Sequence, residues 1–452
     1  MSEVTGQAYA VPAGYGYASI TDQISDIVLK RPVHWGWVVG MVVASAFTLL
    51  FLVAISYLFA VGVGIWGVNR PVAWAFALTN FVWWVGIGHA GTFISAFLLL
   101  LRQKWRTSIN RFAEAMTIFA VAMAGLMPIL HLGRPWFFYW LIPYPDIMNV
   151  WPQWRSPLVW DIFAISTYVT VSLLFWYMGL IPDLATLRDR AKAPWKKVAY
   201  GLAALGWRGE ARHWQRFDSA YLLLAGLAAP LVISVHSVVS LDFAIGNAAG
   251  WHSTIFPPYF VSGALLSGFS MALTIAIPMR AVFGLKAFIT ARHLDNIAKL
   301  MLLCGLLVTY SYLFETFMAF YSGDRFEIAQ VLDRMTGPYA WVYWSVITCN
   351  VLTVQALWSG KVRASPYALF AISIVINIGM WLERFMIVVT SLHKNFLPSS
   401  WGMYYPTFWD IATLLGSIGT FVFLFLLFLR FLPAISIAEM RKLADNPAEG
   451  GK

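Results

Sequence analysis

Residues 36–66 read GWVVGMVVASAFTLLFLVAISYLFAVGVGIW and contain no charged side chain. A helix of about 20 such residues, rising about 1.5 Å per residue, crosses a hydrocarbon core roughly 30 Å thick. Further apolar runs of 20 or more residues recur along nearly the whole chain. The ten predicted membrane-spanning segments are 36–66, 72–101, 112–131, 158–181, 219–242, 259–283, 300–321, 337–358, 366–392 and 409–433.

The composition favours helices as the spanning elements. Of the 452 residues, 60% are hydrophobic and 12% are charged, whereas an ordinary soluble domain has roughly 25% charged residues. The strict alternation of apolar and polar residues that marks a transmembrane β-barrel is absent, which leaves α-helices. We therefore predict an all-α integral membrane protein. Its ten-helix membrane domain covers residues 35–435, between an N-terminal segment, 1–34, and a C-terminal tail, 436–452.

The basic residues are distributed unevenly over the loops. With a cytoplasmic N-terminus and ten spans, 24 of the 31 Lys and Arg residues lie on inner segments, 6 lie on outer loops, and Arg384 lies within a helix. This bias follows the positive-inside rule, so we expect both termini in the cytoplasm. The net charge of +10 is then a consequence of topology, with affinity for anionic lipid headgroups as a by-product, and nucleic acid is not an expected partner.

Two loops are long enough to carry structure of their own. The inner loop 183–217 is basic and is predicted to form one or two surface helices. The outer loop 132–157 is aromatic, which is typical of an interfacial aromatic belt or of a lid or docking surface for a partner outside the membrane. Its aromatic residues are Trp136, Phe137, Phe138, Tyr139, Trp140, Tyr144, Trp151 and Trp154.

Glycine and cysteine patterns predict packing rather than chemistry. Residues 62–67 and 86–91 both match GxGxxG, but neither follows a strand of a βαβ unit, so these glycines are expected to allow close helix packing. The two cysteines, Cys304 and Cys349, both fall within predicted helices. They provide no disulfide framework and no cysteine-ligated cluster, and no metal site is predicted.

Four ionisable residues are expected in the outer half of the membrane. His131 ends the third helix, Asp161 lies in the first turn of the fourth, and the fifth runs outward through His236 to Asp242. Burying each such group costs roughly 2.5–3.5 kcal/mol, so each requires an explanation. An imidazole and a carboxylate in one pocket, His131 and Asp161, suit a hydroxyl-bearing head group. Equally, His131 can bond a loop carbonyl, and Asp161 can pair with a loop arginine and the helix dipole.

A second set of ionisable residues lies deeper, namely His89, Glu114, Glu315, Glu383 and Arg384. Adjacent helical residues point about 100° apart, so Glu383 and Arg384 are not expected to pair with each other. Arg384 is expected to meet Glu315 instead. These residues are either structural ion pairs or steps in a proton path. Haem ligation by two histidines on facing helices is not expected, because His89 is placed at a different depth from His131 and His236.

Three motifs resemble those of a known family. They are HLGRPW at 131–136, SPLVWD at 156–161, and the segment 234–259, which includes SVHS and GWHSTIFPPY. They resemble the NrfD and polysulfide-reductase membrane-subunit family over about residues 30 to 435. Chain length, helix number and the loop near Arg188 are most similar to ActC, the quinol-binding NrfD-like subunit of alternative complex III.

The resemblance implies a fold and a function. The fold would be two four-helix bundles, helices two to five and six to nine, flanked by helices one and ten. His131 and Asp161 would contact quinol on the outer side, with Asp242 as a third contributor. The motifs also carry Arg134, His236 and His252 as candidate quinol-binding residues.

The partners implied by the resemblance hold the redox centres. Menaquinol or ubiquinol would be the substrate, and this chain would hold no haem or iron–sulfur cluster. Electrons would pass to a periplasmic iron–sulfur subunit and then to c-type cytochromes, beside a second NrfD-like subunit in a bacterial inner membrane. Two alternatives are the membrane anchor of a molybdenum-dependent reductase, such as polysulfide reductase, and a proton-coupled transporter, for which paired broken helices are expected.

Overall fold

The structure, a computed structural model, describes residues 15–141 and 153–445, and it is helical without a strand in those ranges. Ten helices there are long and apolar enough to span a membrane, as predicted. They are α3 (Trp35–Val61), α4 (Phe76–Thr92) continued by η2 (Phe93–Phe97) and α5 (Leu98–Leu100), α6 (Asn110–His131), α7 (Pro157–Arg190), α9 (Ala211–Ala244), α10 (Phe256–Val282), α11 (Ala291–Ser322), α13 (Ala340–Val346) continued by η6 (Ile347–Leu352), α14 (Thr353–Gln355) and η7 (Ala356–Trp358), α16 (Pro366–Phe385) continued by η8 (Met386–Thr390), and α17 (Phe408–Phe431).

Shorter helices connect or cap the spans. They are α2 (Tyr17–Leu29), η1 (Val63–Ile65), η3 (Lys104–Ser108), η4 (Pro135–Leu141), α8 (Pro194–Ala203), η5 (Leu285–Ala287), α12 (Arg325–Thr336), α15 (Gly360–Ala364), η9 (Pro398–Ser400) and α18 (Ile437–Asp445). The inner loop 183–217 therefore holds one separate helix, α8. Most of the rest of that loop extends α7 to Arg190 and α9 back to Ala211, because polar residues continue a helix beyond the hydrocarbon core without losing backbone hydrogen bonds.

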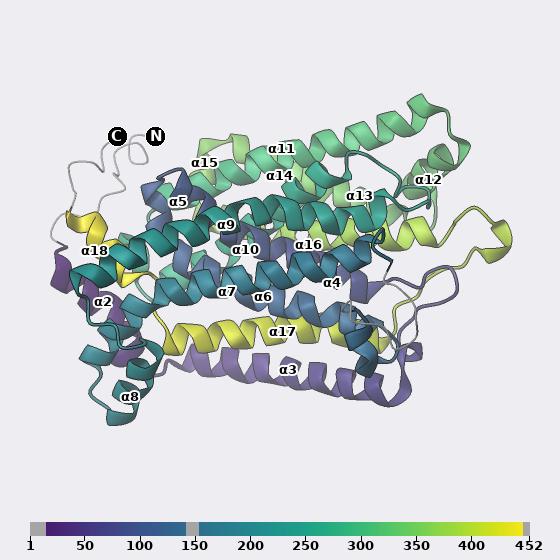
Figure 1. Ribbon diagram of the computed structural model, residues 1–452. Coiled ribbons are helices and arrows are strands. Elements are labelled where there is room, and N and C mark those ends of the chain that lie inside the picture. Colours follow the sequence, from purple (N-terminus) through teal and green to yellow (C-terminus); the bar gives the residue numbers. More distant parts are fainter. Residues whose placement is uncertain (1–14, 142–152, 446–452) are drawn as a thin grey trace.

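The spans form the two expected bundles. The first contains α4, α6, α7 and α9, and the second contains α10, α11, α13–α14 and α16. Helices α3 and α17 pack on each other along one side of the molecule (Figure 1). Helix α4 also packs on α10 of the other bundle, and 83% of its most apolar window is buried, compared with 17% for α3. Helix α4 is therefore a core element, while α3 lies at the edge of the molecule with an exposed apolar face.

Glycines allow the close contact of α4 with its neighbours. A Cβ at Gly91 would overlap the backbone of Ala113 in α6, and one at Gly268 of α10 would overlap Ala90 in α4. The GxGxxG motif at residues 86–91 thus lies inside a helix and serves packing, as the sequence predicts.

The two ends of the bundle differ in their helices. Helices α2, α8 and α18 lie at one end, here called the α2 end, and α12 lies at the opposite α12 end (Figure 1). The predicted terminal segments contain α2 and α18, which pack against each other. The remaining terminal residues, 1–14 and 446–452, lie outside the described residues.

Candidate functional site

The first bundle holds a pair of buried carboxyl groups near the α12 end. Asp161, in the first turns of α7, is 6% exposed, and Asp242, near the end of α9, is 9% exposed. The two carboxyl groups lie close enough to interact electrostatically. Neither carboxyl oxygen of Asp242, nor Oδ1 of Asp161, has a hydrogen-bond partner among the described residues. Neighbouring carboxyl groups that are buried resist carrying two negative charges at once, which favours one proton shared between them.

His131 lies against an aromatic wall at the same end. Its ring meets Trp74 edge to face at 6.2 Å, and Trp74 stacks on Trp251 at 5.8 Å. Trp251 in turn lies edge-on to Phe243 at 5.0 Å, next to Asp242 in sequence. Among the described residues, no hydrogen bond or ion pair links His131 directly to Asp161. The direct partner of Asp161 is Asp242 instead, because α7 packs along α9.

A cavity of about 740 Å³ is lined by residues that come directly after His131 in the sequence. Arg134 lines it together with Gly62 and Phe137, and the described part of the chain places no carboxylate within ion-pair distance of Arg134. His252, in the turn between α9 and α10, is exposed.

The aromatic loop is only partly described. Trp136 and Trp154 are each 49% exposed, as expected of side chains at an interface. The aromatic positions Tyr144 and Trp151, on which the interpretation as a lid depends, lie outside the described residues.

Two histidines meet in the middle of the first bundle, and here the sequence prediction is wrong. The sequence predicts different depths for His89 and His236, yet their ring centroids are 4.9 Å apart. Both are fully buried. His236 lies six residues before Asp242, about 9 Å along the helix axis, so α9 carries it down to the level of His89.

Tyr168 completes this histidine pair. Its ring stacks on His89 at 4.8 Å, and its hydroxyl lies 2.7 Å from Thr92 Oγ1 and donates to the carbonyl of Gly88 at 2.9 Å. His89 Nδ1 lies 2.6 Å from the carbonyl of Val85, while its Nε2 and both ring nitrogens of His236 have no partner in the described residues. Three imidazole nitrogens without a hydrogen-bond partner in the described residues thus lie close together in an apolar interior.

A charged cluster, here called the Glu114 cluster, fills the first bundle toward the α2 end. Arg111 Nη1 donates to Glu114 at 2.9 Å, and Arg111 Nη2 donates to Asp183 at 3.3 Å. Tyr221 donates to the other Glu114 oxygen at 3.1 Å. Helix α18 closes the cluster, since the backbone N–H of Ala438 donates to Asp183 at 2.9 Å.

The second bundle holds the Glu383 cluster, which corrects another expectation. Arg384 Nη1 donates to its neighbour Glu383 at 2.5 Å, although the sequence predicts that the two do not pair. Long side chains bend around the helix and overcome the 100° offset when both are excluded from water. Tyr312 also donates to Glu383, and Asn350 Nδ2 lies 3.4 Å from the same oxygen.

Glu315 has a different partner from the one predicted. It accepts from Arg334 at 2.7 Å, not from Arg384. Glu315 lies two turns from the α12 end of α11, where α12 folds back and brings Arg334 to it. Arg334 also donates to the carbonyl of Gly250 at 3.1 Å.

Several residues of these clusters are not indicated by the sequence analysis. Tyr168, Tyr221 and Tyr312 are ordinary apolar-helix residues in sequence, and Arg111 resembles an ordinary loop charge. The sequence does offer one signal for the three tyrosines, because a tyrosine hydroxyl buried in a spanning helix needs a hydrogen-bond partner. Trp251 lies within the GWHSTIFPPY motif, whereas Trp74 carries no signal beyond aromatic abundance.

Comparison with known proteins adds the family. Residues 64–394 match the family described as "Polysulphide reductase, NrfD". The chain belongs to the NrfD family. This NrfD protein is also 24% identical over 436 residues to a putative dimethyl sulfoxide reductase membrane subunit of Halobacterium salinarum. That alignment covers 85% of this chain and 91% of the relative. The family match contains the carboxyl pair, the histidine pair and both charged clusters apart from α18.

Proposed function

We propose that this chain is the quinol-binding membrane subunit of an oxidoreductase complex. The observation that carries the proposal is the pair of neighbouring buried carboxyl groups, Asp161 and Asp242, near the α12 end beside the aromatic wall that holds His131. A planar, hydroxylated ring fits between aromatic side chains, and groups that exchange protons are what its oxidation requires.

The reaction releases two electrons and two protons for each quinol oxidised to quinone. His131 accepts one hydroxyl proton, and the Asp161–Asp242 pair accepts the other. Arg134 and His252, on the loops at the same end, face the partner subunit that takes the electrons at its iron–sulfur cluster. In this proposal the α12 end faces the periplasm of a bacterial inner membrane and the α2 end faces the cytoplasm, in accord with the distribution of basic residues.

A proton path through the first bundle is part of the proposal. The groups of this path follow one another in space from the α2 end toward the carboxyl pair. They are the Glu114 cluster and then Tyr168 with the histidine pair. The Glu383 cluster supplies a second candidate route in the other bundle. Replacing Glu114 by Gln and measuring protons released per quinol in vesicles tests the path; an unchanged ratio removes Glu114 from it.

The decisive experiment uses Asp161→Asn and His131→Ala in the purified complex. We expect quinol oxidation to fall about 100-fold in each, the usual loss for a positioned acid or base. Asp218→Asn is the control, since Asp218 is an exposed carboxylate at the α2 end that pairs with Lys442. Full activity in both site variants would overturn the site.

Two kinds of complex fit this site. In alternative complex III, the partners are c-type cytochromes, a periplasmic iron–sulfur subunit and a second NrfD-like subunit. The Halobacterium salinarum relative is named as a dimethyl sulfoxide reductase membrane subunit, which favours the second kind, the membrane anchor of a reductase, here proposed to be molybdenum-dependent. The native complex distinguishes them, because multihaem absorbance identifies the first and bound molybdopterin the second.

A proton-coupled transporter is the rival from another class. The three π-helical stretches, η2, η6 and η8, lie in spanning helices that remain continuous, rather than in the paired broken helices of many transporters. Transport by the isolated chain without quinone would support the rival and contradict the proposal.

A further inference from the structure

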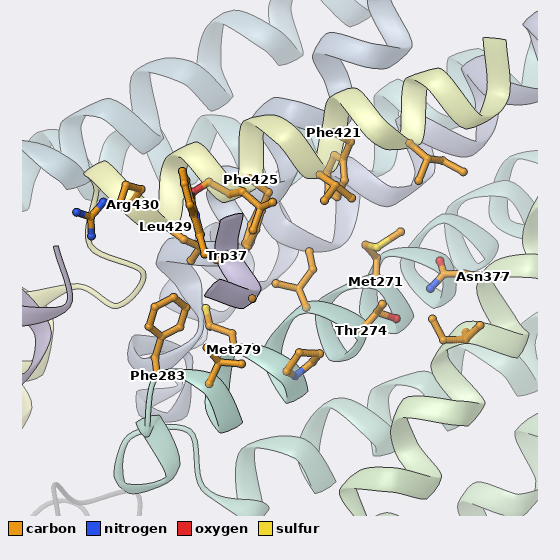
Figure 2. Close-up of a pocket in the computed structure, with 18 of the residues that line it drawn as sticks. Trp37, Met271, Thr274, Met279, Phe283, Asn377, Phe421, Phe425, Leu429 and Arg430 are labelled. Carbon is orange, nitrogen blue, oxygen red and sulfur yellow. Dashed lines mark hydrogen bonds between the residues drawn. The ribbon is translucent and has the colours of Figure 1, made fainter. Parts of the chain in front are cut away.

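A large apolar cavity lies between the α3–α17 pair and the second bundle, away from the carboxyl pair. Its volume is about 890 Å³, near the top of the roughly 300–1,000 Å³ range of ligand pockets. Trp37, Met271, Phe421 and Phe425 are among the side chains that line it (Figure 2). The walls come from α3, α4, α10, α16 and α17.

The cavity runs lengthwise along the spanning helices. Arg430, in the last turn of α17, lies at one end and Asn377, in the middle of α16, lies at the other (Figure 2). Ile378 and Val422 line the cavity and are 53% and 39% exposed. Exposed apolar side chains on spanning helices face the bilayer, so lipid can enter the cavity from the side.

Two arginines stand at the α2 end of this cavity. Arg31 Nη2 donates to the carbonyl of Val282 at 2.7 Å, and its guanidinium lies 5.2 Å from the ring centroid of Phe283. Arg430 Nη1 donates to the carbonyl of Arg31 at 3.0 Å. Within residues 15–141 and 153–445, no carboxylate forms an ion pair with either guanidinium. Backbone carbonyls therefore hold both positive charges in place, and no carboxylate of the described residues neutralises them.

We propose that the cavity binds an anionic phospholipid, with its phosphate at Arg31 and Arg430 and an acyl chain along the apolar wall. A guanidinium binds a phosphate through charge and paired N–H donors. Basic pockets between spanning helices at the membrane surface are a known form of headgroup site. The apolar length of the cavity, which begins at the two charges, matches the amphipathic shape of such a lipid.

The strongest rival occupant is a quinone. Asn377 Oδ1 and Trp83 Nε1, both in the cavity lining, have no hydrogen-bond partner among the described residues. A quinone head could bind them in mid-membrane, but it would leave the arginines without an anion. Charge complementarity therefore favours the phospholipid.

The test is a lipid titration of the delipidated complex, followed by native mass spectrometry. The probes are phosphatidylglycerol and phosphatidylcholine with the same acyl chains. We expect Arg31→Gln with Arg430→Gln to weaken phosphatidylglycerol binding roughly 25-fold, since each surface arginine contributes roughly a factor of five. Phosphatidylcholine binding should change little.

Two further variants separate site from surface charge. Arg212→Gln with Arg216→Gln removes two exposed arginines from the α2 end of α9 and should leave phosphatidylglycerol binding unchanged. Met271→Trp narrows the cavity and should weaken binding although both arginines remain. Equal loss in the two double variants would overturn the proposal. A second outcome would also overturn the proposal. In it, the complex holds quinone that is lost in Asn377→Leu, and phosphatidylglycerol binding does not change when Arg31 and Arg430 are replaced.

Discussion

At the scale of single residues, buried charge is balanced by immediate neighbours. Glu383 is fully buried and Arg384 is 2% exposed, and Tyr312 and Asn350 satisfy the carboxylate further. The Arg384 guanidinium also lies 4.5 Å from the ring centroid of Phe260. Removing one member of such a pair leaves the other charge buried and unpaired, which costs more than the pair contributes.

Glu383→Gln should therefore destabilise the second bundle by about 3 kcal/mol or more. Glu383→Gln combined with Arg384→Met should recover most of that loss, because no unpaired charge remains. The measurement is the thermal midpoint of the purified complex carrying Glu383→Gln alone, Arg384→Met alone, or both changes together. Additive losses would show that the two side chains contribute independently.

At the scale of elements, α12 and α18 attach to opposite ends of the bundle through a few buried contacts. Glu327 and Arg334 of α12 hold the turn at Gly250, with Glu327 accepting its N–H at 3.0 Å. The adjacent Trp251 donates to the carbonyl of Ile387 at 2.7 Å and supports Trp74. The helix outside the membrane thus positions the aromatic wall beside His131.

The α12 contact should depend on pH. Burial raises the pKa of Glu327 in the folded protein, so the folded state binds the proton more tightly than the unfolded state does. Stability from this group therefore rises as pH falls from 7 through the folded pKa. As the pH is lowered from 7 to 5, the thermal midpoint of the wild type should rise relative to that of Glu327→Gln. A difference that is constant with pH would contradict this.

Helix α18 should open more often when one largely buried ion pair is removed. Glu439 pairs with Arg106 at 3.3 Å and accepts from Asn110 at 2.9 Å. In Glu439→Gln, hydrogen exchange in α18 should become faster, in line with the loss of about 1–3 kcal/mol. Lys442→Gln on the same helix is the control, because its pair with Asp218 is exposed and contributes little.

At the scale of the whole molecule, the α4–α10 contact joins the bundles. Gly268 of α10 lies against Ala90 and the carbonyl of Ile87, with no room for a Cβ. Without a hydrophobic force between helices inside lipid, such close packing provides the association. The two bundles, and with them the two charged clusters, keep their relative position through this contact.

Gly268→Val should therefore destabilise the complex by about 1–3 kcal/mol, through overpacking. Gly226→Val is the matched control, since Gly226 lies on an exposed face of α9 with no atom near its missing Cβ. Thermal midpoints of both variants provide the measurement. Equal midpoints would mean that the bundles are joined mainly by other contacts.

The sequence by itself determined the ten spans, the all-helical class and the packing role of residues 86–91. Each depends on local composition, because a bilayer accepts only long apolar segments that satisfy their own backbone hydrogen bonds. It also indicated which residues require an explanation, since any ionisable side chain in such a segment carries a cost. Asp161, Asp242, Glu114 and Glu383 stand out in this way.

Only the tertiary structure decided which of these residues meet. It paired Asp161 with Asp242, His89 with His236, Glu383 with Arg384 and Glu315 with Arg334. Such pairings depend on which helix faces which and on how far each is displaced along its axis. A shift of a few ångströms between two helices exchanges one partner for another, and no local feature of the sequence specifies that shift.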